Sequence, residues 1–119
     1  MNARQKPAEL APPAATVFRS TVHGLAFAGR TRHLRELRRG AELVVLSSPP
    51  GPPPAEVWIH LKDGDPLGHL PPEIAAWLCP WIHNGGHAKA KVLKVGDENV
   101  PTWKRLLIEV SCSELPVGT

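Results

Sequence analysis

Prolines and glycines interrupt this chain so often that they restrict it to short elements of secondary structure. Fourteen prolines and ten glycines are spread over 119 residues, and five of the prolines fall in the segment SSPPGPPP at 47–54. Proline removes a backbone donor and glycine costs backbone entropy, so both weaken long helices and central strands. The pattern excludes a long helical bundle. It predicts short strands joined by tight turns, with 47–54 as an exposed loop.

Hydrophobic periodicity divides the rest of the chain into short elements. Apolar residues alternate or cluster as in strands at 21–28, 42–46, 56–62, 66–70, 87–95 and 103–112, and helical spacing occurs at 31–39 and from 71 to about 83. Pro80 lies within the second helical pattern and predicts a kink or break there. The order predicts a mainly β (α+β) fold, a small antiparallel β-barrel of about six strands with one or two short helices.

Length and composition favour one small domain. We expect a flexible Pro/Ala-rich tail at 1–19, a folded domain at 20–113 and a C-terminal tail at 114–119. No stretch approaches the roughly 18 consecutive apolar residues that span a bilayer, and the N-terminus has no apolar signal segment. Two cysteines are too few for a disulfide framework. We therefore expect a cytoplasmic protein with free thiols and no membrane partner.

The basic residues are concentrated in one segment, RTRHLRELRR at 30–39. This segment carries a net charge of +4 within a chain of net +3, so the remainder sums to −1. Such a cluster can bind phosphates in a salt-dependent way. The alternative is a solvated helix face, with Leu34 and Leu37 toward the core and Arg32 paired with Glu36 outside.

Four segments, in order, carry a resemblance to a known family: VHGLAF at 22–27, LRRGAELVVL at 37–46, LGHLP at 67–71 and RLLIEV at 105–110. Together they resemble the HIRAN domain over about residues 20–112, in its stand-alone bacterial form. The resemblance implies a nucleic-acid-binding module for single-stranded DNA or DNA ends in DNA repair or processing. It also implies that translocase activity, found in longer members, is absent here.

The proline loop departs from the family pattern. HIRAN domains that bind DNA ends carry Asn and Asp in this loop, where this chain has Pro52 and Ala55. Neither replacement can hydrogen-bond a terminal hydroxyl through its side chain. The resemblance therefore does not extend to selectivity for a 3′ end.

Binding of a single strand requires aromatic faces for the bases and cations for the backbone. The residues that fit these roles are Phe27 and Trp58 as faces, Arg30, Arg32, Arg35, Arg38, Arg39, Lys89 and Lys91 as phosphate contacts, and His69 as a hydrogen-bond donor. Each also has a structural interpretation. Phe27 could lie in the core, the lysines could simply face solvent, and His69 could be a structural residue.

Three other functions compete with nucleic-acid binding. A protein-interaction module would use the proline loop and exposed tryptophans. A small zinc-binding protein would use Cys79, His83 and His87, spaced i, i+4, i+8, with Cys112 as the fourth ligand. Gly85-Gly86 should end the helix before His87, which argues against this set. A small metal-dependent enzyme could use an acid/base or metal group of His60, Asp63, Asp65 and His69 around one turn, which a polar hairpin explains more simply. No hydrolase elbow or P-loop occurs, so we expect neither an enzyme nor a cofactor. A helicase or nuclease is a further partner that the resemblance suggests.

Overall fold

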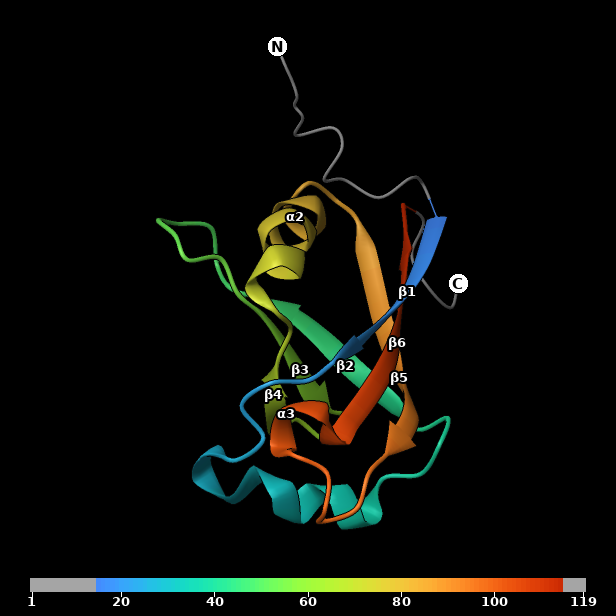
Figure 1. Cartoon of the computed structure of the whole chain (residues 1–119). Coiled ribbons are helices and arrows are strands. Elements are labelled where there is room, and N and C mark those ends of the chain that lie inside the picture. The colour runs from blue at the N-terminus through green and yellow to red at the C-terminus, as the bar shows by residue number, and fades with distance from the viewer. Residues whose placement is uncertain (1–14, 115–119) are drawn as a thin grey trace.

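Within residues 15–114 the fold is one antiparallel sheet of six strands that curls around a core (Figure 1). A computed structural model describes residues 15–114. The elements, in chain order, are β1 (Ala15–Thr21), the 3₁₀ helix η1 (Phe27–Glu36), β2 (Glu42–Ser47), β3 (Val57–Leu61), β4 (Pro66–His69), α2 (Pro72–His83), β5 (His87–Val95), α3 (Thr102–Arg105) and β6 (Leu106–Ser113). The strand order is β1-β6-β5-β2-β3-β4. The predicted mainly β, barrel-like class is confirmed.

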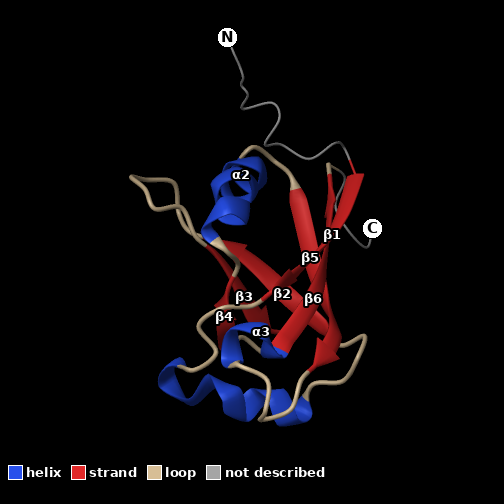
Figure 2. Ribbon diagram, in the orientation of Figure 1, coloured by secondary structure: helices blue, strands red, loops and turns tan. Residues whose placement is uncertain are grey.

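The curl brings the two edges of the sheet together at one point, which we call the seam. β1 and β4 are the edge strands, and Figure 2 shows the chain crossing toward β4 after it leaves β1. His23 then forms an isolated bridge with His69, and each backbone N–H donates to the other's carbonyl at 2.9 Å. Val22 continues the pairing of β1 by donating to Leu106 at 3.1 Å. The seam therefore ties residues 46 positions apart in the chain.

The core fills the inside of the curl, and helices cover its two ends. Figure 1 shows α2 near one end of the sheet and the cyan η1 across the other. The largest fully buried side chains come from β3, β4, β5, β6 and α2, from the segment between β1 and η1, and from the link between β4 and α2. They are Val22, Leu25, Val57, Ile59, Leu67, Leu70, Leu78, Val92, Leu106, Ile108 and Val110. Leu43 of β2 is also buried. The apolar residues of the helix predicted from 71 to about 83, now α2, pack into this core or against it.

Pro80 does not end α2, which runs on to His83. A proline frees the carbonyl of the residue four positions earlier, here Ala76. Pro80 and Ala76 both lie on the exposed side of the helix, where solvent can satisfy that carbonyl. Of the predicted kink or break, the break therefore does not occur.

The predicted N-terminal boundaries need correction. β1 begins at Ala15, so part of the segment expected to be a flexible tail is a strand, while residues 1–14 and 115–119 lie outside the described residues. The strand expected at 21–28 does not form, because the chain turns after Thr21 and enters η1 at Phe27. Pairing of β1 with β6, a contact between distant segments, overrides the local Ala- and Pro-rich composition.

The other elements follow the predicted pattern with shifted ends. The helix expected at 31–39 is the 3₁₀ helix η1 and ends at Glu36. The last strand starts at Leu106, because α3 occupies the residues before it. The Asp63-Gly64 turn joins β3 to β4, with Gly64 at φ +112° and its N–H donating to Leu61. None of the helices in the described part of the chain is long and apolar enough to cross a bilayer.

Cys79 and Cys112 are free and buried, which confirms the expectation of free thiols. Burial raises the pKa of the Cys112 thiol from 9.0 to about 11. Between these values the unfolded chain has lost a proton that the folded chain keeps, so stability falls as the pH rises. We expect the free energy of unfolding, measured in urea, to fall more steeply between pH 9 and 11 in the wild type than in Cys112→Ala. Equal slopes for the two proteins would contradict the expectation.

Candidate nucleic-acid interface

Trp58 stands on the outer face of β3, beside the seam. Its strand neighbours Val57 and Ile59 are fully buried, so alternation directs the indole outward. The indole is held from two sides. Nε1 donates to the Glu56 carboxylate at 3.0 Å, and the His69 ring, on the paired residue of β4, packs edge-on with 5.4 Å between ring centres. Trp58 is therefore a half-buried ring in a set orientation.

Arg30 places a guanidinium over this indole. Its central carbon lies 5.0 Å from the centre of the Trp58 ring, an arrangement worth ~0.5–1 kcal/mol near a surface. Nη1 donates to the Gly24 carbonyl at 2.9 Å, which fixes the side chain. Nε is buried and has no hydrogen-bond partner within residues 15–114. The sequence predicted Arg30 and Trp58 as separate contacts, and the fold joins them.

His69 and His23 complete a group that we call the seam cluster: His23, Arg30, Trp58 and His69. The two imidazole rings lie 6.2 Å apart, centre to centre. His69 Nδ1 donates to the Leu70 carbonyl at 3.3 Å, since a carbonyl only accepts, so Nε2 is the nitrogen left for a ligand. His23 Nε2 lies 3.3 Å from the Thr21 hydroxyl. The cluster thus combines a cation, an indole face and two imidazoles.

Two glycines make this packing possible. Gly24 has φ +85°, and a Cβ there would lie 3.2 Å from the His69 ring and 3.3 Å from the Arg30 guanidinium. Gly68 passes so close to His23 that a Cβ would collide with the His23 carbonyl oxygen and lie 2.8 Å from Val22. The close approach of two backbones at the seam therefore requires glycine at position 68.

Phe27 opens η1 and is 68% exposed, so the interpretation as a core residue is wrong. Its N–H donates to the Gly24 carbonyl at 3.2 Å, the same oxygen that accepts from Arg30. The segment that carries Phe27 is thereby tied to the seam cluster. The exposed ring remains available for stacking.

The rest of the basic segment spreads along the outside of η1. Arg32 donates to the carbonyls of Ala28 and Gly29 instead of pairing with Glu36, because a 3₁₀ helix aligns residues three apart rather than four. Arg38 donates to the carbonyls of Arg35 and Leu37. Arg35 and Arg39 are exposed.

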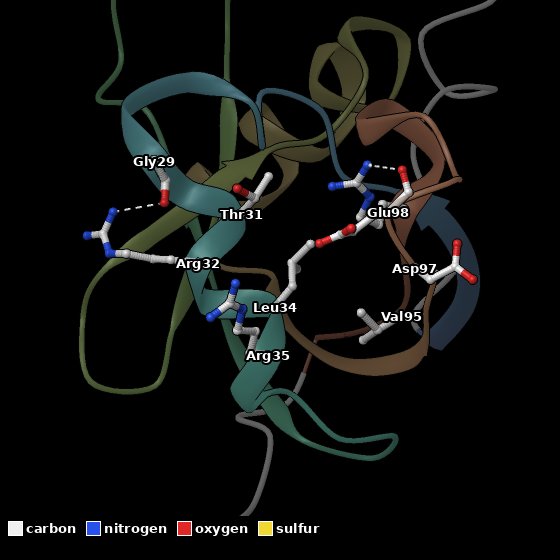
Figure 3. A pocket seen from close by; sticks show the side chains of 10 residues that line it. Gly29, Thr31, Arg32, Leu34, Arg35, Val95, Asp97 and Glu98 are labelled. Carbon is white, nitrogen blue, oxygen red and sulfur yellow. Dashed lines mark hydrogen bonds between the residues drawn. The ribbon is translucent and has the colours of Figure 1, made fainter.

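Arg32 and Arg35 line one side of a cavity of about 550 Å³. Leu34 and Val95 also line it, and Asp97 and Glu98 lie on the facing loop (Figure 3). Both signs of charge therefore border this space, which makes it less suited to a phosphate than the seam cluster.

Lys89 and Lys91 lie on β5, which β2 separates from β3 and the seam cluster. Lys91 Nζ is 3.5 Å from the Glu109 carboxylate, and Glu42 lies opposite Lys91 in the register. The Lys62 ammonium, which hydrogen-bonds Glu42 at 3.0 Å, holds the pKa of Glu42 below its usual value, and Lys89 adds to the effect. The two predicted lysines therefore face carboxylates and do not join the arginines.

The proline loop extends away from the body of the molecule, as Figure 1 shows, and its prolines at 49–54 are exposed, as predicted. Its base is closed by Ser48, whose N–H donates to the Glu56 carbonyl at 2.8 Å and whose Oγ accepts from the Glu56 N–H at 3.1 Å. From α2, His83 Nε2 donates to the Ser48 carbonyl at 2.7 Å. The loop is thus anchored at its base by an imidazole of α2.

The predicted zinc ligands do not assemble. Cys79 Sγ and His83 Nε2 are 3.8 Å apart on α2, but His87 begins β5 and Cys112 lies across from Ala88 on the neighbouring strand. Within residues 15–114, no three His, Cys, Asp or Glu side chains gather closely enough to hold a metal ion. Gly85, at φ +102°, turns the chain after α2 and breaks the helical spacing, as the sequence indicated.

Sequence reasoning missed His23, Gly24, Gly68 and Glu56. His23 and Gly24 lie in a segment read as a strand, and only the bridge to His69 gives them their place. Glu56 precedes Trp58 by two residues, so both side chains lie on the same side of an extended chain. The spacing in the sequence could therefore have predicted the contact between them. The others depend on the closing of the sheet.

This architecture is similar to the crystal structure of the HIRAN domain of human HLTF. The two structures agree with a TM-score of 0.54 and 15% sequence identity, over 83% of this chain and 77% of that chain. No family model matches the sequence. No curated protein matches it either. At this identity the likeness establishes a HIRAN-like fold, so the resemblance expected from the sequence holds for the architecture.

Proposed function

We propose that this chain is a nucleic-acid-binding module that holds single-stranded DNA or DNA ends at the seam cluster. The observation that carries the proposal is the Arg30 guanidinium 5.0 Å over the Trp58 indole, with the His69 ring 5.4 Å away. A base needs an aromatic face and a phosphate needs a cation, and here both stand within one nucleotide's reach. The HIRAN-like fold supports the same class of ligand.

Each group of the cluster has a separate part in the proposal. The exposed Phe27, and Trp58 on the face that Arg30 does not cover, offer ring faces to bases. The edge of Arg30 that does not bond Gly24 donates to a phosphate. His69 Nε2, which accepts while Nδ1 donates to Leu70, is left to accept from a hydroxyl of the ligand. These contacts bind the ring faces of the bases and the sugar-phosphate backbone, so we expect the affinity to depend little on the base sequence. We propose a binding role without a catalytic residue or a cofactor.

The proline loop argues against selectivity for a 3′-hydroxyl. Its prolines supply no N–H groups, and Pro52 and Ala55 supply no polar side-chain atoms. We therefore expect equal affinity for oligonucleotides that end in a 3′-hydroxyl and in a 3′-phosphate. A role in DNA repair or processing, with a helicase or nuclease as partner, and a cytoplasmic setting belong to the proposal on the strength of the family resemblance.

Fluorescence anisotropy with a labelled single-stranded oligonucleotide tests the proposal. The logarithm of the affinity should fall linearly with the logarithm of the salt concentration, with a slope of about −0.7 per phosphate contact. The double variant Arg32→Glu/Arg35→Glu, on the outer side of η1, tests whether the wider basic segment contributes. Absence of salt-dependent binding by the wild type would contradict the proposal.

A protein-interaction module is the second candidate, and the exposed proline loop favours it. The loop is bonded at its base, through Ser48, and its prolines face solvent. A partner protein would have to bind the proline rings in a groove lined by aromatic side chains. Capture of a protein that survives nuclease treatment and is lost when 49–54 is replaced by a Gly/Ser segment would favour this function.

A further inference from the structure

A second cavity, lined by basic residues, lies near the seam, on the side of β1, β5 and α3. Its volume is about 330 Å³, and it is lined by Thr21, Lys94, Gly96, Val100, Lys104, Arg105 and Leu107. Three of these residues are cationic and none is acidic. Gly96 and Arg105 also line the other cavity, beside η1, and Asp97 and Glu98 of the same loop line only that one. The space therefore has the charge that a phosphate group requires.

The wall of this cavity is fixed by backbone contacts of Arg105. Its Nε and Nη2 donate to the Val100 carbonyl at 3.0 and 2.7 Å, and Nη2 also reaches the Glu98 carbonyl at 3.3 Å. The Arg105 carbonyl in turn accepts from the Gly96 N–H at 2.7 Å. These bonds close the loop between β5 and α3 around one guanidinium. The cation is thereby held in place before any ligand arrives.

An exposed indole stands beside the cavity. Trp103 of α3 is 53% exposed, and the ammonium of Lys104 lies 5.1 Å from the centre of its ring. Lys104 also lines the cavity. Here, as at the seam cluster, an aromatic face and a cation occur together, which is the combination that a nucleotide needs.

The two sites are connected through Thr21. Its hydroxyl lies 3.3 Å from His23 Nε2, and the His23 ring lies 6.2 Å from that of His69. Thr21 also lines the second cavity. The seam cluster and the cavity therefore adjoin one short segment, from Thr21 to His23.

We propose that this cavity is a second phosphodiester site, occupied by a later nucleotide of the strand that the seam cluster holds. Lys94, Lys104 and Arg105 neutralise the phosphate, and Trp103 stacks on the adjoining base. The inference rests on the proposed function and extends it, because it makes a strand of several nucleotides the preferred ligand. A very short oligonucleotide would reach only one of the two sites.

Strand length and single lysine substitutions test the inference. We would measure affinities of labelled oligothymidylates of about three and about ten nucleotides, at several salt concentrations, for the wild type, Lys94→Ala, Lys104→Ala and Trp103→Ala. Lys62→Ala is the matched control, since Lys62 is an exposed cation that follows the end of β3 and pairs with Glu42 of β2. The wild type should bind the long strand at least about tenfold more tightly than the short one.

Each variant of the cavity should lose that advantage while keeping its affinity for the short strand. For each lysine variant the salt slope with the long strand should shrink by about 0.7, the value of one phosphate contact. Lys62→Ala should retain the wild-type ratio and slope. A second arm measures inorganic phosphate by calorimetry, because a site for free phosphate shares the same chemistry.

The outcomes separate this inference from the proposed function. If the wild type binds neither strand, the proposed function fails and the inference fails with it. If it binds both strands and the cavity variants keep the full advantage of length, the inference alone is overturned. Micromolar binding of inorganic phosphate together with equal affinity for both strands would identify a site for a free anion, which also overturns the inference.

Discussion

Replacing Trp58 by alanine should weaken the binding of single-stranded DNA by about 10- to 100-fold, measured by anisotropy at fixed salt. Stacking of a base on an aromatic ring is worth ~1–3 kcal/mol, and this substitution removes the ring that Arg30 and His69 surround. It also leaves the Arg30 guanidinium without the face on which it packs. The loss should therefore exceed that of a surface tryptophan with no cation beside it.

Arg30→Lys distinguishes geometry from charge at the same site. A lysine keeps the positive charge but lacks the planar group that covers the indole and bonds the Gly24 carbonyl. We expect the variant to keep most of its salt dependence while losing about tenfold in affinity. Trp77→Ala is the control for general destabilisation, since Trp77 is half-buried on α2 and packs against Phe18. A loss of affinity in Trp77→Ala equal to that in Trp58→Ala would contradict a specific role of the seam cluster.

Gly68→Ala should destabilise the fold by about 3 kcal/mol or more, measured by urea unfolding. The added Cβ collides with the carbonyl oxygen of His23, which is backbone and cannot rotate away as a side chain can. Relief requires the seam to open, and opening breaks the two 2.9 Å hydrogen bonds between His23 and His69. Binding of DNA should fall with stability, because the same bridge positions His69 beside Trp58.

Gly51→Ala provides the matched control for this effect. Gly51 lies in the proline loop, its φ is not positive, and a Cβ there would have nothing within 4 Å. The substitution should change stability by no more than about 1 kcal/mol, in the stabilising direction, because alanine restricts the unfolded chain. If Gly68→Ala proved as stable as Gly51→Ala, the seam would not be the tight closure described above.

Several parts of the fold follow from local chemistry, and the sequence alone predicted them. Alternating residues predicted β5 with its observed ends, because Ala90 and Val92 are buried while Lys89 and Lys91 face solvent. The Asp63-Gly64 turn needed only a residue that tolerates positive φ. Prolines at 49–54 made an exposed loop unavoidable, since such a backbone cannot join a sheet.

For the candidate site, the sequence predicted the types of residue but not which of them are neighbours. The sequence singled out Arg30, Trp58 and His69 by residue type, because cations, rings and imidazoles are the groups that grip a single strand. It could not show that these three meet, while Lys89 and Lys91 lie among carboxylates two strands away.

What the tertiary structure decided is the closure of the sheet. β1 forms where the local composition argues against a strand, because β6 supplies its hydrogen-bond partners from about 90 residues further along the chain. The seam joins His23 to His69, which lie 46 positions apart, and nothing in either local segment encodes that partner. Local patterns specify which residues alternate, turn or carry charge. Which of them become neighbours depends on how the sheet curls, and that is set by the packing of the whole core.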